Sequence, residues 1–347
     1  NKEFQEFRDI ATAEQLYDYV ISRMPEGGEN YLLIDEVQDI ENYENALRSL
    51  HAENRCQVIA TGSNAYIFSS ELGTRLAGRY IEIKIYNLSY LEFLRFHNME
   101  DNDRALMHYL IMGGLPGLLA FKSEEKSQIN DYLEGVYNTV LVKDIVSREK
   151  VRNVTQLENV IRYVADNIGK PLSVANIVRF LTSKGEKISD ETVSNYLKYL
   201  RDSFLALPVK RFDIHGKLLL ETNNKLYFSD HGIRNHLCEP DIRGSIEKVM
   251  ENVVWNHLRR QGFDVTVGIL RAGEIDFVAT RAEQRIYVQV TYLLASDETV
   301  KREFGNLAAI QDNYPKYVVS MDPLCGGFGE YPGIRHINLR DFLKTNL

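Results

Sequence analysis

The chain has 347 residues, of which 44% are hydrophobic and 26% are charged, values that are ordinary for a folded globular protein. Its 41 basic and 49 acidic residues give a formal charge of −8, which argues against a protein that coats nucleic acid over its whole surface. A local basic face remains compatible with this charge. No apolar run reaches the roughly 18–20 residues that cross a bilayer, so we expect no membrane span.

The cysteines argue against a disulfide framework and against a thiolate zinc site. Cys56, Cys238 and Cys325 lie far apart and show no CxxC spacing. This pattern fits the reducing cytoplasm, which is where we expect the protein to be. The first residues, 1–4 (NKEF), do not resemble a native start, so we expect the sequence to begin inside a longer gene product.

The length predicts more than one domain, and three regions differ in their patterns. Residues 1–95 alternate helical stretches with short strands, expected at residues 31–34, 57–60 and 80–85. The first two strands are apolar throughout, which is typical of a parallel sheet that is buried on both faces between helices. The predicted fold class is therefore α/β multidomain, beginning with a parallel sheet.

Residues 96–239 are predicted to be mainly helical. Apolar positions at helical spacing predict a helix over residues 154–168, and Ser173 is the expected N-cap of the next helix. The remaining elements are a helix over residues 190–200 and two short strands, expected at residues 206–209 and 217–220. Helix, turn, helix and hairpin in this order predict a winged-helix module.

Residues 240–347 return to an α/β pattern, in a stretch of ordinary domain length. The expected helices cover residues 245–260 and 299–311, and the expected strands cover residues 265–270, 274–279, 285–291 and 317–321.

Two carboxylates follow the first apolar strand, because Tyr31–Ile34 runs directly into Asp35 and Glu36. In nucleoside triphosphatases, a carboxylate in this place holds Mg²⁺ at the phosphates, and a following Glu deprotonates the attacking water. The alternative is a core strand that ends in solvated acids.

Small polar residues follow the second apolar strand about 25 positions later, as Thr61, Gly62, Ser63 and Asn64. Adjacent parallel strands would bring this turn beside the acid pair, where a hydroxyl or an amide can contact the γ-phosphate or hold the water. The alternative is a polar turn that caps the next helix. Together the two strand ends favour nucleotide hydrolysis.

These residues resemble a group of prokaryotic AAA-type ATPases that carry a C-terminal region of unassigned function. The matching stretches are residues 33–38 (LIDEVQ), 60–64 (ATGSN), 76–80 (LAGRY), 88–93 (LSYLEF), 113–116 (GGLP), 143–145 (KDI), 225–230 (KLYFSD) with Gly232, and 288–292 (VQVTY). Each stretch is short, but their order along essentially the whole chain makes the resemblance specific.

The resemblance implies ATP and Mg²⁺ as cofactors and assigns roles to particular residues. Asp35 is the implied Mg²⁺ ligand, and Glu36 is the implied catalytic base. Thr61 contributes to the nucleotide site, and either Ser63 or Asn64 is the residue that senses the γ-phosphate. Arg79 resembles an arginine finger that acts in a neighbouring subunit, which would require a homo-oligomer; its alternative is a surface ion pair.

The sequence departs from the family in one respect, since it contains no GxxxxGK[ST] loop to cradle the phosphates. Family members carry that loop well before the acidic strand, in a stretch that would precede Asn1. We therefore expect the polypeptide as written to bind ATP poorly or not at all, and we expect ATPase activity in the full-length protein.

The last region resembles the PD-(D/E)XK nuclease fold, which is related to restriction endonucleases. Glu251 and Asp276 stand where two Mg²⁺-binding carboxylates belong, but the next strand offers Gln289 and Thr291 in place of an acid and a lysine. The resemblance therefore implies a surviving fold with a degenerate site that no longer cleaves nucleic acid. The alternative for the two acids is a hydrogen-bonded structural pair.

The winged-helix prediction leaves the partner open between DNA and protein. Residues 151–215 contain ten Lys or Arg and seven Asp or Glu, and the second helix opens with Asp190 and Glu191, whose charge repels phosphate. A nucleic-acid-binding protein or nuclease regulated by the ATPase part is thus the alternative function. Residues 113–117 (GGLPG) lack the Lys and Ser/Thr of a phosphate loop and are expected to separate two helices.

Overall fold

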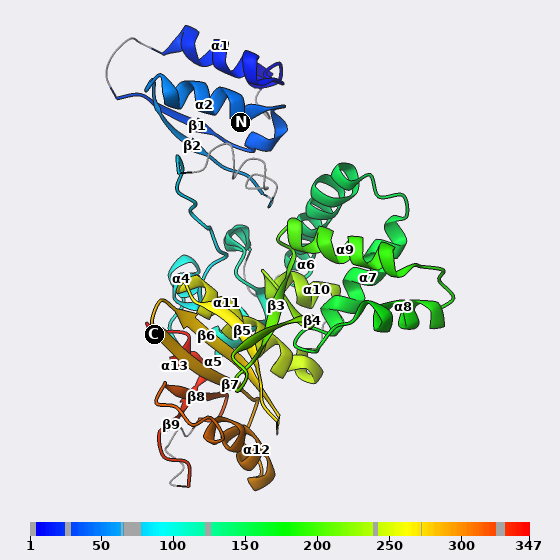
Figure 1. Cartoon of the computed structure of the whole chain (residues 1–347), viewed down its shortest axis with the longest axis vertical. Helices are drawn as coiled ribbons and strands as arrows, with labels where there is room; N and C mark the ends of the chain where they lie inside the picture. Colours follow the sequence, from blue (N-terminus) through cyan, green and yellow to red (C-terminus); the bar gives the residue numbers. More distant parts are fainter. Residues whose placement is uncertain are drawn as a thin grey trace. The chain divides into compact units, whose positions relative to one another are not determined.

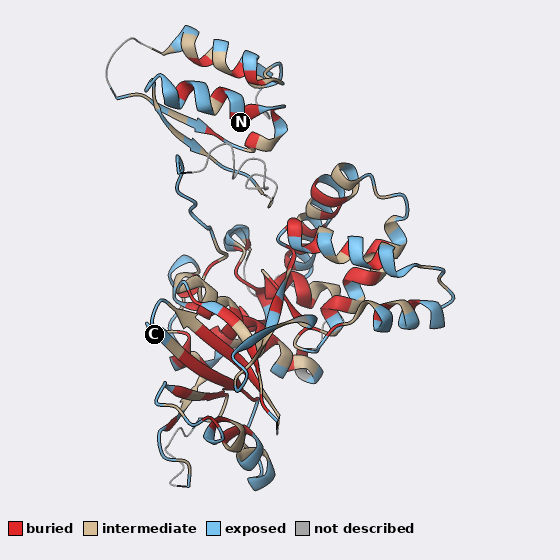
Figure 2. Cartoon of the chain, viewed as in Figure 1, coloured by how far each residue is buried: buried red, intermediate tan, exposed pale blue. Residues whose placement is uncertain are grey.

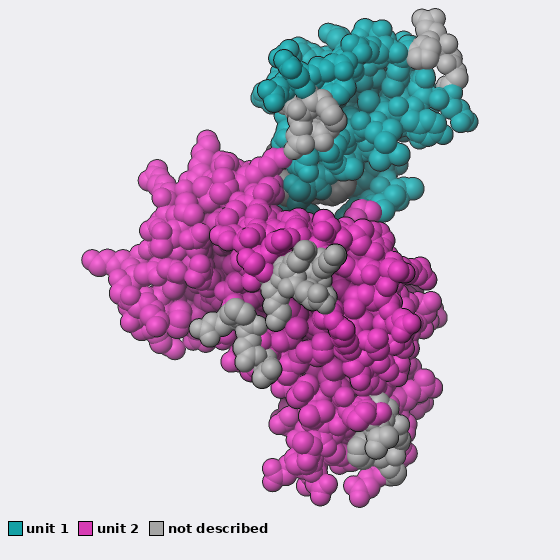
Figure 3. All heavy atoms as spheres, turned by 180° about the vertical axis from the view of Figure 1, so that it is seen from behind, with its two compact units in different colours: residues 1–84, 202–204 teal, residues 85–201, 205–347 magenta. Residues whose placement is uncertain are grey.

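The computed structural model describes residues 5–24, 29–63, 65, 78–121, 126–238, 242–271, 273–323 and 330–347. The chain forms two compact units, which Figure 3 shows in different colours. Unit 1 comprises residues 1–84 with 202–204, and unit 2 comprises residues 85–201 with 205–347.

Unit 1 has a small α/β arrangement in which two strands run parallel. Its elements are η1 (Gln5–Phe7), α1 (Ala13–Arg23), β1 (Tyr31–Ile34), η2 (Val37–Asp39), α2 (Tyr43–Ala52) and β2 (Gln57–Ala60). Thr12 begins α1 with a capping box, in which its hydroxyl accepts from the backbone of Gln15 and the Gln15 side chain accepts from the Thr12 backbone. Both expected strands and their parallel pairing are confirmed.

Only one face of the β1–β2 pair is buried within the described residues, so the expected burial on both faces is wrong there. Helices α1 and α2 lie on the same side of the strands (Figure 1), and the core between them contains Leu16 and Leu50. On the opposite face, Tyr31 and Leu33 are 59% and 70% exposed, and Ile59 is 54% exposed. Most of both strands is exposed or intermediate in burial (Figure 2).

The strand expected over residues 80–85 is also wrong, since residues 80–89 contain no helix or strand. The alternating side chains of Ile81, Ile83 and Ile85 are 90%, 78% and 89% exposed. A strand is stable when a neighbour receives its backbone hydrogen bonds, and in the described residues β1 and β2 pair only with each other. Alternation alone therefore gave the wrong prediction.

The first part of unit 2 is helical, as predicted. Its elements are α4 (Tyr90–Phe96), α5 (Asp103–Met112), η4 (Pro116–Ala120), α6 (Lys126–Thr139), the π-helical η5 (Val140–Ser147), α7 (Val154–Asp166), α8 (Val174–Ser183), α9 (Asp190–Asp202) and α10 (His231–Leu237). Ser173 caps α8 through the backbone N–H of Asn176, which confirms the predicted N-cap. The predicted apolar face of α7 is buried, including Leu157 and Ile161.

The second part of unit 2 is a mixed seven-stranded sheet with strand order β4-β3-β5-β6-β7-β8-β9. The strands are β3 (Ala206–Asp213), β4 (Leu218–Phe228), β5 (Asp264–Ile269), β6 (Glu274–Arg281), β7 (Gln284–Val290), β8 (Lys316–Ser320) and β9 (Ile334–Asn338). The helices and helical turn of this part are η6 (Ile242–Ser245), α11 (Ile246–Arg260), α12 (Asp297–Ala308) and α13 (Leu339–Phe342). Apolar clusters lie on both faces of the sheet, one around α11 and one around α12.

The predicted hairpin is part of this sheet. Strand β3 pairs antiparallel with β4 and also, at Arg211, Phe212 and Asp213, parallel with β5. Because of this pairing, residues 96–239 and 240–347 share one compact unit, although the sequence predicts them as separate domains. The division into three domains and the winged-helix assignment stay predictions.

The chain is thus an α/β protein of more than one unit. Within the described residues, no helix is both long enough and apolar enough to cross a membrane. Cys56 and Cys238 are free thiols, and Cys325 lies outside the described residues.

Candidate functional site

The carboxyl ends of β1 and β2 meet at one edge of the small sheet. In the parallel register Ile34 stands opposite Ala60. The backbone N–H of Thr61 donates to the carbonyl of Ile34 at 2.8 Å, and the N–H of Val37 donates to the carbonyl of Thr61 at 3.0 Å. The turns that follow the two strands are therefore bonded to each other through their backbones, which fixes the spacing of the side chains that they carry.

This edge brings together four of the predicted site residues. The Thr61 hydroxyl donates to Oδ1 of Asp35 at 2.6 Å, and the Ser63 hydroxyl donates to Oε2 of Glu36 at 3.1 Å. Asp35 is exposed and Glu36 is half-buried, so both carboxylates are accessible to a ligand. Asn64 lies outside the described residues, and the choice between Ser63 and Asn64 stays a prediction.

Glu36 has an unusual backbone conformation, with φ 53° and ψ 53° in the left-handed region. A non-glycine residue there carries a conformational cost, and such residues concentrate at functional sites. In this conformation Glu36 precedes η2, whose Gln38 donates a side-chain hydrogen bond to Oε2 of Glu36 and another, of 3.4 Å, to Ser63. Gln38 was not predicted as a site residue; its place two positions after Glu36 in the resemblance motif was the available signal.

Arg79 is exposed and lies in a described stretch without helix or strand. Since an arginine finger acts in a neighbouring subunit, its role stays a prediction.

In unit 2, the acids of the nuclease resemblance are contacted by residues of β4. The Tyr227 hydroxyl donates to Oε2 of Glu251 at 2.8 Å, and the ammonium group of Lys225 lies 3.8 Å from Oδ1 of Asp276. The same ammonium group is paired with Glu274. Lys225 was not predicted for this site; its signal in the sequence was its place in the resemblance motif of residues 225–230, directly before the apolar residues 226–228.

The other predicted residues of this cluster are also bonded. Oδ2 of Asp276 accepts from the backbone of Val290 at 2.8 Å, and Oε1 of Gln289 accepts from the backbone of Asp276 at 3.3 Å. The Thr291 hydroxyl donates to Glu247 at 3.2 Å. These contacts give each of the predicted residues a structural partner.

Burial dominates the ionisation of this cluster. Loss of solvent, followed by the charge of Asp276, raises the pKa of Glu251 to about 8. Loss of solvent also raises the pKa of Asp276 to about 7, against the lowering effect of Lys225. Burial by itself lowers the pKa of Lys225, but the surrounding carboxylates outweigh it and the pKa ends above its usual value.

Three glycines of the resemblance motifs surround the buried carboxylate of Asp230. Its Oδ1 accepts from the backbone of Gly232 at 2.8 Å and of Ile233 at 3.1 Å, and its Oδ2 accepts from the backbone of Gly114 at 2.9 Å and from the Asn87 amide at 3.1 Å. A Cβ on Gly113, whose φ is +87°, would lie 2.4 Å from Oδ1 of Asp230. We call this arrangement the Asp230 clamp. The predicted break at residues 113–117 is confirmed for 113–115, which follow α5, whereas Pro116 and Gly117 begin η4.

Comparisons with known proteins address the family. An uncharacterized protein of Haemophilus influenzae is 34% identical to this chain over 325 residues, which is 92% of the chain and 80% of the relative. The chain belongs to the same protein family. Residues 1–94 of the chain match the AAA domain, so the chain contains an AAA-type ATPase domain.

The chain also resembles a second family model and more distant proteins. Its residues 103–242 match a domain of unknown function, DUF8612. An uncharacterized protein of Methanocaldococcus jannaschii is 28% identical over 281 residues, and the match spans 76% of this chain but 61% of that relative. The solved structure of a Walker-type ATPase of Pyrococcus abyssi is 16% identical with a TM-score of 0.42, covering 65% of this chain and 66% of that one.

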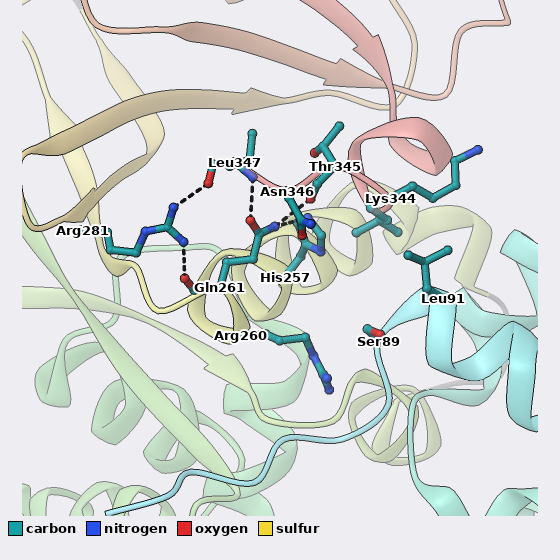
Figure 4. Close-up of a pocket in the computed structure, with 11 residues that line it drawn as sticks. Ser89, Leu91, His257, Arg260, Gln261, Arg281, Lys344, Thr345, Asn346 and Leu347 are labelled. Atoms are coloured by element: carbon teal, nitrogen blue, oxygen red, sulfur yellow. Dashed lines mark hydrogen bonds between the residues drawn. The ribbon is translucent and has the colours of Figure 1, made fainter.

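A pocket of about 430 Å³ lies in unit 2 (Figure 4). Its basic side chains Arg260, Arg281 and Lys344 bond, respectively, to Glu92 at 2.6 Å, to the Leu347 carbonyl at 2.6 Å and to Asp101 at 2.6 Å. Since each cation already has an oxygen partner, the pocket is better explained as an internal contact of unit 2 than as an anion site.

Proposed function

We propose that the acid pair at the end of β1 is the magnesium- and water-binding half of an ATP-hydrolysis site. The observation that carries the proposal is the pairing of each carboxylate with a hydroxyl from the end of β2, Asp35 with Thr61 at 2.6 Å and Glu36 with Ser63 at 3.1 Å. The match of residues 1–94 to the AAA domain supports it.

The donor set fits a divalent cation, because the exposed Asp35 carboxylate is a hard oxygen ligand of the kind that Mg²⁺ prefers. When bound, Mg²⁺ supplies charge neutralisation at the nucleotide phosphates. The Thr61 hydroxyl holds the Asp35 carboxylate in one orientation. Asp35 is therefore the proposed Mg²⁺ ligand, and Thr61 is its positioning residue.

Glu36 is the proposed general base. Its carboxylate receives hydrogen bonds from Ser63 and Gln38, which fix its position and leave it ready to accept a proton from a water molecule. Ser63 also lies where a γ-phosphate sensor is expected. The role of Arg79 as an arginine finger belongs to the same proposal; a finger that acts in a neighbouring subunit would require a homo-oligomer.

Coupling between the ATPase domain and unit 2 is the second half of the proposal. The chain leaves unit 1 at Lys84, and three residues later Asn87 donates to Asp230. This short covalent connection supports a coupling in which a conformational change of unit 1 on nucleotide binding is transmitted to unit 2 through residues 85–87. The helical segment and the nuclease-like segment are the proposed receivers of that change.

The test is ATP turnover by the product of the complete gene with Mg²⁺, compared between wild type and Glu36→Gln. A general base contributes about 10²–10⁴-fold, so turnover of the variant should fall by at least 100-fold while ATP binding is retained. Unchanged turnover would refute the assignment of Glu36. Loss of ATP binding together with turnover would point to misfolding, which circular dichroism of the variant would reveal.

A further inference from the structure

Lys225 is a buried cation in the middle of the carboxylate cluster of unit 2. It is 2% exposed, its ammonium group is paired with Glu274, and the same group lies 3.8 Å from Oδ1 of Asp276. A buried ammonium group is stable only when carboxylates or other acceptors replace its lost hydration. The two acids of β6 provide that replacement, so the lysine and the acids depend on each other.

Both carboxylate oxygens of Asp276 and one of Glu251 already have partners in the protein. Oδ2 of Asp276 accepts from the Val290 backbone at 2.8 Å, and Oε2 of Glu251 accepts from the Tyr227 hydroxyl at 2.8 Å. In the described part of the chain, no group of three or more His, Cys, Asp or Glu residues is arranged to hold a metal ion. The residues therefore do not fit the metal that the nuclease resemblance implies.

Space at the cluster points the same way. Gly169 has φ +73°, and a Cβ built on it would lie 2.6 Å from Oε2 of Glu251. The backbone of the loop after α7 thus approaches this carboxylate closely. Mg²⁺ retains several water molecules when a protein binds it, and these waters need room beside the ligand.

We propose that Lys225 is a built-in cation that compensates part of the carboxylate charge of Glu274 and Asp276 and stands in place of a divalent metal ion. An ammonium group compensates carboxylate charge, but it has no vacant coordination position and does not activate a water molecule as a metal ion does. The cluster is consequently a metal-independent ionic centre that holds β4 to β6. Unit 2 does not cleave phosphodiesters through these residues.

The first experiment measures Mn²⁺ binding without nucleotide by electron paramagnetic resonance on wild type, on Asp35→Asn and on the double variant Asp35→Asn with Asp276→Asn. Asp35→Asn removes the proposed metal ligand of unit 1, so any Mn²⁺ that this variant binds must be bound elsewhere. The proposal expects the Mn²⁺ spectrum with Asp35→Asn to equal the spectrum of Mn²⁺ in buffer alone. Mn²⁺ that still binds Asp35→Asn and is lost in the double variant would overturn the proposal.

The second experiment removes the cation with Lys225→Ala and uses Lys225→Arg as the matched control that keeps the charge. Breaking a buried ion pair should lower the Tm of Lys225→Ala by roughly 5–15 °C, and Lys225→Arg should lose less. A Tm of Lys225→Ala equal to that of wild type would contradict the proposal, and if that variant does not fold, the binding experiment decides.

Discussion

The hydroxyl of Thr61 donates a hydrogen bond of 2.6 Å to Oδ1 of Asp35, across the parallel pair of β1 and β2. The two residues are 26 positions apart in the sequence, and strand register alone brings them together. A contact between two residue types that serve phosphate chemistry, at the edge where α/β sheets bind ligands, is the basis of the proposed function.

Thr61→Val should separate orientation of Asp35 from folding. Valine keeps the shape of threonine but removes the hydroxyl, so Asp35 loses its positioning bond. We expect ATP turnover of the product of the complete gene to fall by about 10-fold or more, since misplaced catalytic groups cost rate steeply. The measurement is the dependence of turnover on Mg²⁺ concentration, which should shift to higher Mg²⁺.

Thr61→Ser is the matched control, because it keeps the hydroxyl and should keep most of the turnover. If valine and serine had the same effect, the hydroxyl of Thr61 would have no part in catalysis.

Gly113→Ala tests the Asp230 clamp. Gly113 has φ +87°, and an added Cβ would lie 2.4 Å from Oδ1 of Asp230. Both backbone strain and the clash oppose the variant, so we expect a loss of about 2–4 kcal/mol in the free energy of unfolding. Urea denaturation of wild type and variant measures it. Gly135→Ala is the control, because a Cβ there meets nothing within 4 Å; equal losses would speak against the clamp.

Asp230→Asn tests the charge of the clamp separately from its shape. The carboxylate accepts four N–H hydrogen bonds, from Gly114, Gly232, Ile233 and Asn87. An amide would turn an NH₂ group toward at least one of these donors, which should cost about 2–4 kcal/mol because the donors are buried. Ser173→Ala removes a cap at the more exposed start of α8 and should cost about 1 kcal/mol. A smaller loss for Asp230→Asn than for Ser173→Ala would be unexpected.

His257 predicts a pH dependence of stability. Burial lowers the pKa of His257 to about 4, so the folded protein keeps this imidazole neutral while an unfolded chain protonates it near the ordinary value of about 6.5. Between these two values the unfolded state binds more protons, so stability falls as the pH is lowered from about 6.5 to about 4. The full effect is on the order of 3 kcal/mol.

The free energy of unfolding should be measured against pH for wild type and His257→Phe. The slope between pH 6.5 and 4 should be shallower in the variant, whatever its absolute stability. Parallel curves would show that His257 does not carry this dependence.

A final prediction concerns nucleic acid. Helix α9 opens with Asp190 and Glu191, both exposed, which gives its first turn a negative charge. We expect gel-shift experiments on duplex DNA to show weak binding that disappears as the salt concentration is raised. Tight binding that is lost on neutralising Arg179 or Lys184 would instead support the winged helix as a DNA reader.

The sequence predicts local elements better than distant contacts. Apolar spacing locates α7 and the buried strands, and the succession of an acidic strand and a polar strand predicts that Asp35 and Thr61 meet. It could not predict that Lys225 of β4 reaches Asp276 of β6, because 51 positions separate them and neither periodicity nor spacing encodes that contact. The strand predicted at residues 80–85 is wrong, because the alternation of apolar residues does not reveal whether a pairing strand is present.

The Asp230 clamp has a mechanical consequence. Asn87 is fixed to a buried carboxylate only two residues after unit 2 begins at Ile85. A pull on the chain at that point acts directly on the Asn87 amide, which donates to Asp230 and to the Ser229 carbonyl, and three backbone hydrogen bonds hold Asp230 in turn. Tension that enters unit 2 through this segment is therefore transferred within a few residues to its interior, where α10 and the loop after α5 share the strain.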